Sequence, residues 1–207
     1  MTLLLLTELI GTAAFAVSGA LVGLEKQMDL FGVVVLGVTT AVGGGIIRDI
    51  LLGATPPAAF QSPVFLLCAF GVSVITFLPC VHVHFRRNDL TFQRILLVMD
   101  AVGLGSFTVI GVQAAHAAAP DAGVFLASFV GVVTGIGGGV LRDVFAGNTP
   151  YVFVRHFYAC ASIVGGVVCA AAWNLAGPSV SMAAGAVLTL SLRLLAARFR
   201  WSLPKAH

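Results

Sequence analysis

Charged residues are scarce in this chain. Its 207 residues include 11 Lys and Arg and 8 Asp and Glu, a charged fraction of 9%, whereas about a quarter is usual in soluble domains. Hydrophobic residues make up 59% and the mean hydropathy is +1.06. These values exclude an ordinary soluble domain and indicate a membrane protein with several spans. The net charge of +3 gives no reason to expect a nucleic-acid partner.

Residue sets for catalysis or metal binding are also missing from the sequence. The four cysteines form no Cys-x-x-Cys pair, and the five histidines show no spacing typical of metal ligands. No nucleophile, base and orienting residue occur in a recognisable arrangement. We therefore expect neither an enzyme nor a protein that holds a cofactor or a structural metal.

Long apolar runs occupy most of the chain. A hydrocarbon core about 30 Å thick requires roughly 20 apolar residues per helix. The sequence predicts an all-α membrane protein with seven such segments, at 3–24, 31–52, 62–82, 93–114, 122–146, 152–175 and 178–198. The first segment resembles a signal peptide, but no Lys or Arg precedes it and it has a counterpart later in the chain, so we expect a retained helix.

A ten-residue motif occurs twice. Residues 40–49 read TAVGGGIIRD, and residues 134–143, which lie 94 positions further on, read TGIGGGVLRD. We interpret 1–92 and 93–176 as two three-helix repeats, and 177–207 as a seventh helix with a basic tail. Because three crossings place the start of the second repeat on the opposite side of the membrane, the repeats are predicted to have inverted topology.

Three consecutive glycines stand at the centre of each copy. Each glycine costs a helix roughly 1 kcal/mol relative to alanine, so a triplet weakens its turn by about 3 kcal/mol. We expect the second and fifth segments to be kinked or unwound there, with the two breaks facing each other near the midplane. Close packing of two helices is the alternative explanation. The triplets are Gly43, Gly44 and Gly45, and Gly137, Gly138 and Gly139.

An arginine and an aspartate follow each triplet. They are Arg48 and Asp49 in the first copy, and Arg142 and Asp143 in the second. Neighbouring residues on a helix point about 100° apart, so we expect pairing across the pseudo-twofold axis or with another helix rather than within one copy. These residues are candidates for charged groups that shape or gate a path; the alternative is an ion-pair network that only holds the helices in shape.

Two acids and two threonines complete the candidate site. Glu8 and Asp100 occupy equivalent positions in the first and fourth segments, 92 residues apart. A carboxylate at such a depth is expected to face a cavity or a cation, unless it lies at head-group level and is hydrogen-bonded to a neighbour. Thr40 and Thr134 are candidates for lining a hydrated path, although threonine also bonds back to its own helix.

Basic residues predict the orientation. With seven crossings, most of them lie on the side of the C-terminus, and Arg48 alone lies near the other side. The positive-inside rule therefore predicts a cytoplasmic C-terminus and an N-terminus outside. The residues on the C-terminal side are Lys26, Arg86, Arg87, Arg94, Arg155, Arg198, Arg200 and Lys205, with Arg142 and Arg193 near it.

The doubled GGG-x-x-RD motif with a proline downstream, in a chain of this length with three plus three plus one segments, resembles the prokaryotic trimeric intracellular cation (TRIC) channels. Many bacterial members carry two "glycine transporter" domains. The resemblance covers nearly the whole chain. The two triplets match the family's kinks, and the Arg and Asp residues match the charged positions after them. The phosphoinositide motif of the animal members is reduced here to a single base, Arg48.

The resemblance implies a homotrimer in the bacterial inner membrane, with one pore in each protomer bounded by the kinked second and fifth helices. It also implies permeation by monovalent cations, chiefly potassium with weak discrimination from sodium, with membrane lipids as the other partners. A secondary carrier for glycine or another small zwitterion is the alternative, in which Arg48 or a half-helix N-terminus holds the carboxylate. A structural membrane protein without transport is a third interpretation.

Overall fold

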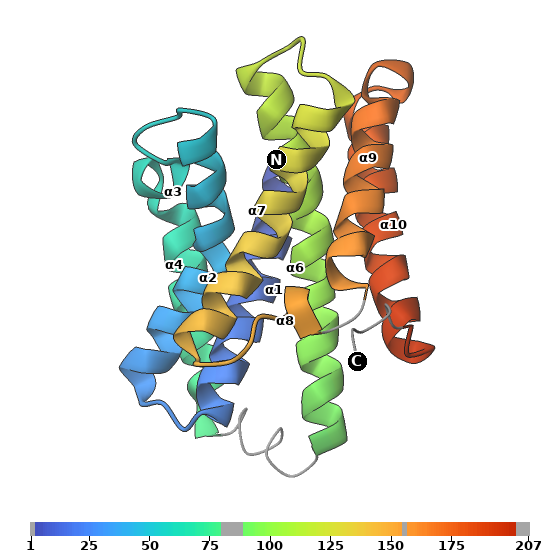
Figure 1. Cartoon of the computed structure of the whole chain (residues 1–207). Helices are drawn as coiled ribbons and strands as arrows, with labels where there is room; N and C mark the ends of the chain where they lie inside the picture. Colours follow the sequence, from blue (N-terminus) through green and yellow to red (C-terminus); the bar gives the residue numbers. More distant parts are fainter. Residues whose placement is uncertain (1–2, 80–88, 155–156, 202–207) are drawn as a thin grey trace.

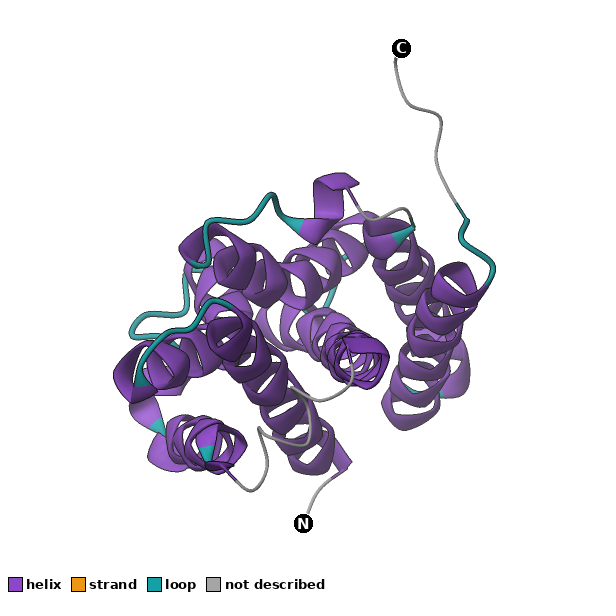
Figure 2. Ribbon diagram, turned by 90° about the horizontal axis from the view of Figure 1, so that it is seen from below, coloured by secondary structure: helices purple, strands orange, loops and turns teal. Residues whose placement is uncertain are grey.

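The computed structural model describes residues 3–79, 89–154 and 157–201, and within these ranges the regular structure consists of helices joined by turns and loops (Figure 1). The longer helices bundle together, and α6 packs against α1, α7, α9 and α10 (Figures 1 and 2). The helices are α1 (Leu3–Glu25), α2 (Leu30–Leu51), α3 (Ala58–Gln61), α4 (Pro63–Phe77), α6 (Asp89–Ala118), α7 (Val124–Phe145), α8 (Tyr151–Val154), α9 (Tyr158–Ala176) and α10 (Pro178–Arg198).

The start of α2 and the ends of α2 and α7 are determined by residues suited to helix termini. The Asp29 side chain accepts a hydrogen bond from the Gly32 backbone N–H at 2.7 Å and caps the start of α2. Gly53 and Gly147 follow the ends of α2 and α7 with φ of 71° and 68°. This left-handed conformation closes a helix and is open to glycine without strain. The repeated glycine downstream of each motif is therefore a helix terminator.

The seven predicted segments correspond to seven helices, with two differences. Six helices are long and apolar enough to cross a membrane, whereas α4, within the predicted 62–82, has 15 residues. The predicted segment 152–175 is divided into α8 and α9. Phe157 has φ of 66° at this division, and a left-handed residue cannot continue a right-handed helix.

The two halves of the chain run in opposite directions. In Figure 1, α1 descends, α2 rises and α4 descends, whereas α6 rises, α7 descends and α9 rises. The last long helix, α10, descends beside α9 and α6. The predicted inverted repeat with an additional seventh helix is thus the observed architecture, and it places the equivalent motifs of α2 and α7 in antiparallel helices.

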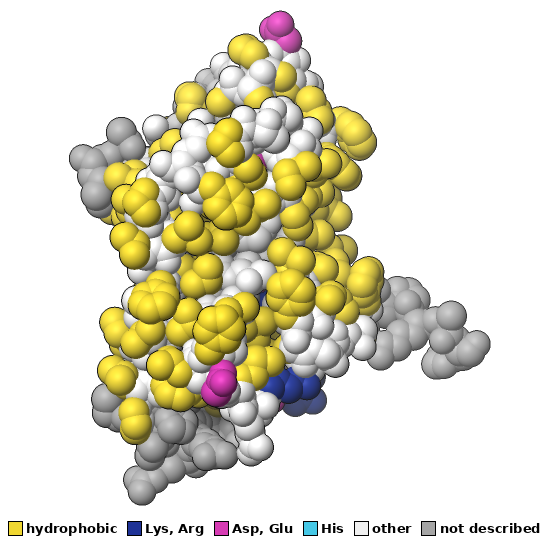
Figure 3. Space-filling model, turned by 90° about the vertical axis from the view of Figure 1, so that its left-hand side faces the viewer, with side chains coloured by type: hydrophobic (Ala, Val, Ile, Leu, Met, Phe, Trp, Pro, Cys, Tyr) yellow, Lys and Arg dark blue, Asp and Glu magenta, His cyan; other side chains and the backbone are white. Residues whose placement is uncertain are grey.

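The outer surface is largely apolar. Phe31, Phe125 and Leu175 are 77%, 83% and 90% exposed, and Figure 3 shows hydrophobic side chains over most of the height of one face, with Lys and Arg near its lower end. Such an exposed apolar surface indicates contact with lipid. Four residues used for the orientation prediction lie outside the described residues: Arg86, Arg87, Arg155 and Lys205.

Candidate functional site

The two glycine triplets meet where α2 crosses α7. A Cβ placed on Gly44 would overlap the carbonyl oxygen of Thr134, and a Cβ placed on Gly138 would overlap the carbonyl oxygen of Thr40. These contacts are equivalent, since both Gly44 and Gly138, and Thr40 and Thr134, are 94 residues apart. The triplets therefore face each other, as the inverted repeat predicts, and their middle glycines let the two backbones touch.

Both triplets lie within continuous α-helix. The expectation of an unwound turn was wrong, because the two backbones pack closely and each helix keeps its own hydrogen bonds. Gly137 lies in the same crossing, where its Cβ would be 3.1 Å from the Cα of Gly44. Close packing, the alternative explanation for the triplets, accounts for these contacts, while a kink at these positions stays a prediction.

The last glycine of each triplet lies beside charged groups instead. A Cβ on Gly45 would be 3.7 Å from a terminal nitrogen of Arg48. A Cβ on Gly139 would be 2.8 Å from the hydroxyl of Tyr158 and 3.8 Å from a carboxylate oxygen of Asp100. The triplets therefore join the helix crossing to a charged cluster on either side of it.

Thr40 and Thr134 are fully buried next to the crossing. Each hydroxyl donates a hydrogen bond of 2.6 Å to a carbonyl one turn earlier in its own helix, that of Leu36 or Val130. In this conformation the two threonines pack and do not face an open path. Their role in lining a pore stays a prediction that requires the crossing to open.

The arginines bond to the aspartates beside them. Arg48 Nε donates to Asp49 Oδ1 at 2.8 Å, and Arg142 Nε donates to Asp143 Oδ1 at 2.8 Å. The expectation that neighbours in one copy do not pair was wrong, whereas the expected pairing with another helix is present for Arg142, which also bonds to Asp100 of α6. Although the Cα–Cβ bonds of the neighbours diverge, the arginine side chain is long enough to turn back along the helix surface and reach the adjacent carboxylate.

The second oxygen of each aspartate holds the segment after the helix. Asp49 Oδ2 accepts from the backbone N–H of Ala58, the first residue of α3, and Asp143 Oδ2 accepts from that of Tyr151, the first residue of α8; both bonds are 2.8 Å long. An acid near a helix N-terminus satisfies an N–H that has no partner within the helix. Each aspartate thus fixes its arginine and folds the following short helix back onto the site.

The second repeat holds a closed cluster. Arg142 and Asp100 form an ion pair of 2.7 Å, and Arg142 Nη1 also donates to Ser18 Oγ at 2.6 Å. Arg142 is 0% exposed, and Asp100 and Asp143 are each 1% exposed. Removal of one partner from such a buried pair typically costs about 3–5 kcal/mol. The cluster therefore locks α7 to α1 and α6.

The first repeat holds a more open version of this cluster. Glu8, Arg48 and Asp49 line a cavity of about 30 Å³, which has room for a water molecule. No ion pair within 4 Å joins Glu8 to Arg48, in contrast to their counterparts Asp100 and Arg142. The two copies of one motif are thus in different states, one closed by direct contact and one with a small polar cavity.

Two aromatic rings fill the space between the clusters. Phe15 of α1 and Phe107 of α6 stack with ring centroids 5.3 Å apart, and both are buried. Phe107 also lines the cavity that contains Glu8. Phe15 lies beside the crossing, where a Cβ on Gly138 would be 3.1 Å from its ring. The described conformation is therefore closed at its centre.

Sequence reasoning did not identify Ser18 or Tyr158 as members of the site. Tyr158 is 2% exposed, and its hydroxyl lies 3.5 Å from Asp100 Oδ1. Ser18 has no sequence signal that distinguishes it from the other hydroxyl residues of the apolar segments. Tyr158 is one of only two tyrosines in the chain, and its place at the start of a predicted span offered a weak signal.

Fold and site together define a polytopic α-helical membrane protein built on an inverted repeat, with a charged cluster in each half. The sequence family described as Glycine transporter matches residues 5–79 and again 97–174. The chain is 42% identical over 199 residues to the UPF0126 inner membrane protein YadS of Escherichia coli (strain K12), with 95% of this chain and 93% of YadS covered. A UPF0126 membrane protein of Vibrio cholerae is 40% identical over 204 residues, with 98% and 82% covered.

Solved structures of TRIC channels are similar to this chain over nearly its whole length. The TRIC trimeric intracellular cation channel orthologue from Rhodobacter sphaeroides matches with a TM-score of 0.87 and 35% identity, over 97% of this chain and all of that one. A TRIC cation channel solved to explain conductance matches with a TM-score of 0.84 and 37% identity, over 100% and 98%. The chain belongs to the Glycine transporter family, in its prokaryotic TRIC channel branch. TRIC channels are not enzymes, in agreement with the sequence prediction.

Proposed function

We propose that this protein is a potassium-permeable channel for monovalent cations that assembles as a homotrimer with one pore in each protomer. The observation that carries the proposal is the likeness, over the whole chain, to solved TRIC cation channels. We further propose that it lies in a bacterial inner membrane, where its relative YadS is found, with the N-terminus outside and the C-terminus in the cytoplasm.

The charges of the two clusters support a cation rather than an anion. The first cluster contains one base, Arg48, and two acids, Glu8 and Asp49. The second contains Arg142 with Asp100 and Asp143. With all groups ionised, each sums to +1 − 2 = −1. In surroundings of low dielectric constant, a net negative site attracts a cation and repels an anion.

The positions of the two clusters, on either side of the glycine crossing, also suit a path for a cation. Arg48 and Arg142 each follow the middle glycine of their triplet by four residues, which corresponds to about 6 Å along a helix. Because α2 and α7 are antiparallel, one cluster lies on each side of the crossing. A cation would pass one cluster, the crossing with its buried threonines, and then the other, after rearrangement at the glycines has opened the closed centre.

The family description, Glycine transporter, keeps a carrier for a small zwitterion as the second candidate function. Such a carrier needs a free positive group for the carboxylate of its substrate. Arg48 contacts Asp49 through Nε at 2.8 Å and through Nη2 at 2.7 Å, and α2 has no unwound turn with free N–H groups at Gly43–Gly45. These contacts favour the channel.

The deciding experiment places the purified protein in planar bilayers under a potassium gradient. We expect discrete single-channel openings whose reversal potential follows the potassium gradient. In parallel, proteoliposomes are tested for uptake of labelled glycine. Silent bilayers together with saturable glycine accumulation would reject the channel and support the carrier. Inactivity in both assays would support a structural role.

A further inference from the structure

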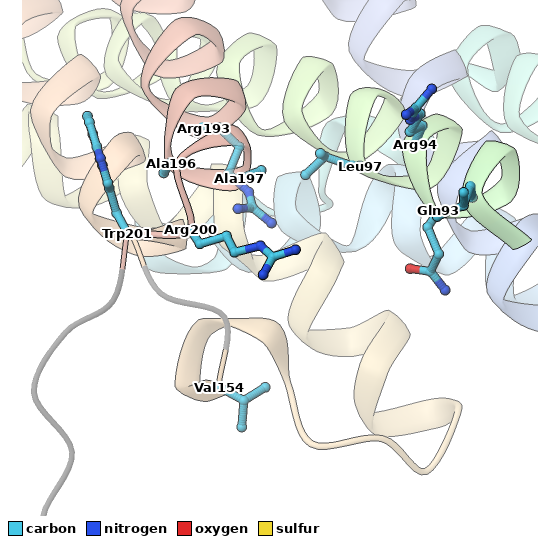
Figure 4. A pocket seen from close by; sticks show the side chains of 10 residues that line it. Gln93, Arg94, Leu97, Val154, Arg193, Ala196, Ala197, Arg200 and Trp201 are labelled. Carbon is cyan, nitrogen blue, oxygen red and sulfur yellow. The ribbon is translucent and has the colours of Figure 1, made fainter.

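A second cavity lies outside the two clusters, at the end of the bundle where α10 ends and α6 begins. Its volume is about 380 Å³, within the range of small-molecule sites. Its walls come from the first turns of α6, the last turns of α10 and Val154 of α8 (Figure 4). It is therefore more than ten times larger than the cavity beside Glu8.

The charged residues that line this cavity are all positive among those the structure describes. Arg94, Arg193 and Arg200 contribute to it, together with Gln93, and none of its described lining residues is acidic. Figure 4 shows the guanidinium groups of Arg193 and Arg200 projecting into the same space from α10 and the residues that follow it. Like charges gathered in one cavity repel each other unless an anion lies between them.

Arg193 is a buried lining residue of this cavity with an unpartnered donor. It is 3% exposed, and its Nε is buried without a hydrogen-bond acceptor. Its guanidinium carbon lies 5.1 Å above the ring of Tyr158, and no carboxylate of the described residues is within 4 Å of it. A cation–π contact offsets only part of the cost of removing a charge from water. The buried Nε of Arg193 is therefore available to an acceptor atom of a ligand in the cavity.

We propose that this cavity binds the phosphate group of an anionic ligand, which the head group of an anionic phospholipid best supplies. Guanidinium groups bind phosphate oxygens through paired hydrogen bonds, and those of Arg193 and Arg200 project into the cavity, which Arg94 also lines (Figure 4). Leu97, Ala197 and Trp201 add apolar wall to the same space, which suits the glycerol and upper acyl region of a lipid better than a free ion. The site is distinct from the single base near the first glycine triplet.

Between Arg193, which would bind such a ligand, and the closed cluster lies a single residue, Tyr158. Arg193 stacks on Tyr158, and the hydroxyl of Tyr158 lies 3.5 Å from Asp100, the partner of Arg142. An anion that draws Arg193 toward the cavity changes the contact between the Arg193 guanidinium and the Tyr158 ring. The binding site thus has a contact route to the second-repeat cluster, whether or not that cluster belongs to a pore.

Binding is measured by native mass spectrometry of the whole protein in detergent, with phosphatidylglycerol compared with phosphatidylcholine, and by calorimetry with pyrophosphate. The test variants are Arg193→Gln and Arg200→Gln. Arg198→Gln is the matched control, since Arg198 is exposed at the end of the same helix and does not line the cavity. Arg200 is also exposed, so its variant tests the site even where Arg193→Gln fails to fold.

We expect wild-type protein and Arg198→Gln to retain phosphatidylglycerol in preference to phosphatidylcholine. Each test variant should lose at least about tenfold in affinity, because a hydrogen bond to a charged group contributes about that much. Pyrophosphate binding with the same variant pattern would identify a soluble phosphate as the ligand instead of a lipid. Equal affinity in the test and control variants, or no preference for either anionic probe, would overturn the proposal.

Discussion

At the crossing of α2 and α7, we predict that substitution by alanine destabilises the protein at Gly138 but not at Gly45. A methyl group at Gly138 would overlap the backbone carbonyl oxygen of Thr40 and would lie 3.1 Å from two ring carbons of Phe15. Neither a helix carbonyl nor a stacked ring can turn aside, so the helices must separate. In Gly45→Ala, by contrast, the nearest atom of another group is 3.7 Å away, an ordinary contact.

The two substitutions have the same effect of helix propensity on the free energy of unfolding, and they differ in steric overlap. Both gain up to about 1 kcal/mol from the better helix propensity of alanine. Only Gly138→Ala pays for overpacking, about 1–3 kcal/mol. The helix term cancels in the comparison, so we expect Gly138→Ala to be about 1–3 kcal/mol less stable than Gly45→Ala. We also expect Gly45→Ala to be at least as stable as the wild type.

Reversible unfolding in mixed micelles of dodecyl maltoside and SDS, followed by circular dichroism, measures this difference. Both variants must first be shown to reach the membrane fraction. If Gly138→Ala unfolds at the same SDS fraction as Gly45→Ala, the close backbone approach at the crossing is refuted. The triplets would then have to be explained by flexibility alone.

Three further predictions concern the charged clusters. Asp143→Asn removes a charge from the side of Arg142, and we expect reduced potassium current in bilayers with normal membrane insertion; wild-type current would mean that the pair only supports packing. Ser18→Ala removes a 2.6 Å hydrogen bond to Arg142 and should lower stability by about 1.5–3 kcal/mol in mixed micelles; an unchanged midpoint would count against that bond. Glu8→Gln changes the charge of the first cluster from −1 to 0, so the reversal potential in a KCl gradient should move toward zero; an unmoved potential would exclude Glu8 from selectivity.

The architecture of this protein could be predicted from its sequence because two independent signals agree. Apolar segments of membrane-spanning length give the helices, and the motif displaced by 94 residues gives the inverted repeat. The reciprocal contacts of Gly44 with Thr134 and of Gly138 with Thr40 follow directly from that symmetry. A pseudo-twofold axis predicts that backbone contacts at the crossing of the two copies recur in both directions, whereas side-chain contacts differ where the residues differ.

The pairing of charges could not be predicted, since it depends on side-chain reach rather than on helical geometry. The angle between Arg48 and Asp49 on the helix suggested separate partners, yet the guanidinium turns back to the adjacent carboxylate. The return of α3 and α8 onto these aspartates was equally hidden, because a backbone N–H has no sequence signal. Helical periodicity in the sequence does not predict which side chains and backbone groups bond to each other outside the regular helix pattern.

The unpaired seventh helix adds a contact to the second-repeat cluster. Arg193 of α10 packs on the ring of Tyr158, whose hydroxyl lies near Asp100 in the closed cluster. In the first repeat the position equivalent to Tyr158, 94 residues earlier, is Val64, which has no hydroxyl, and a small cavity lies beside Glu8. The seventh helix therefore breaks the symmetry that the repeat establishes. The arginine-lined cavity is therefore connected to the second-repeat cluster by a chain of direct contacts, from Arg193 through Tyr158 to Asp100.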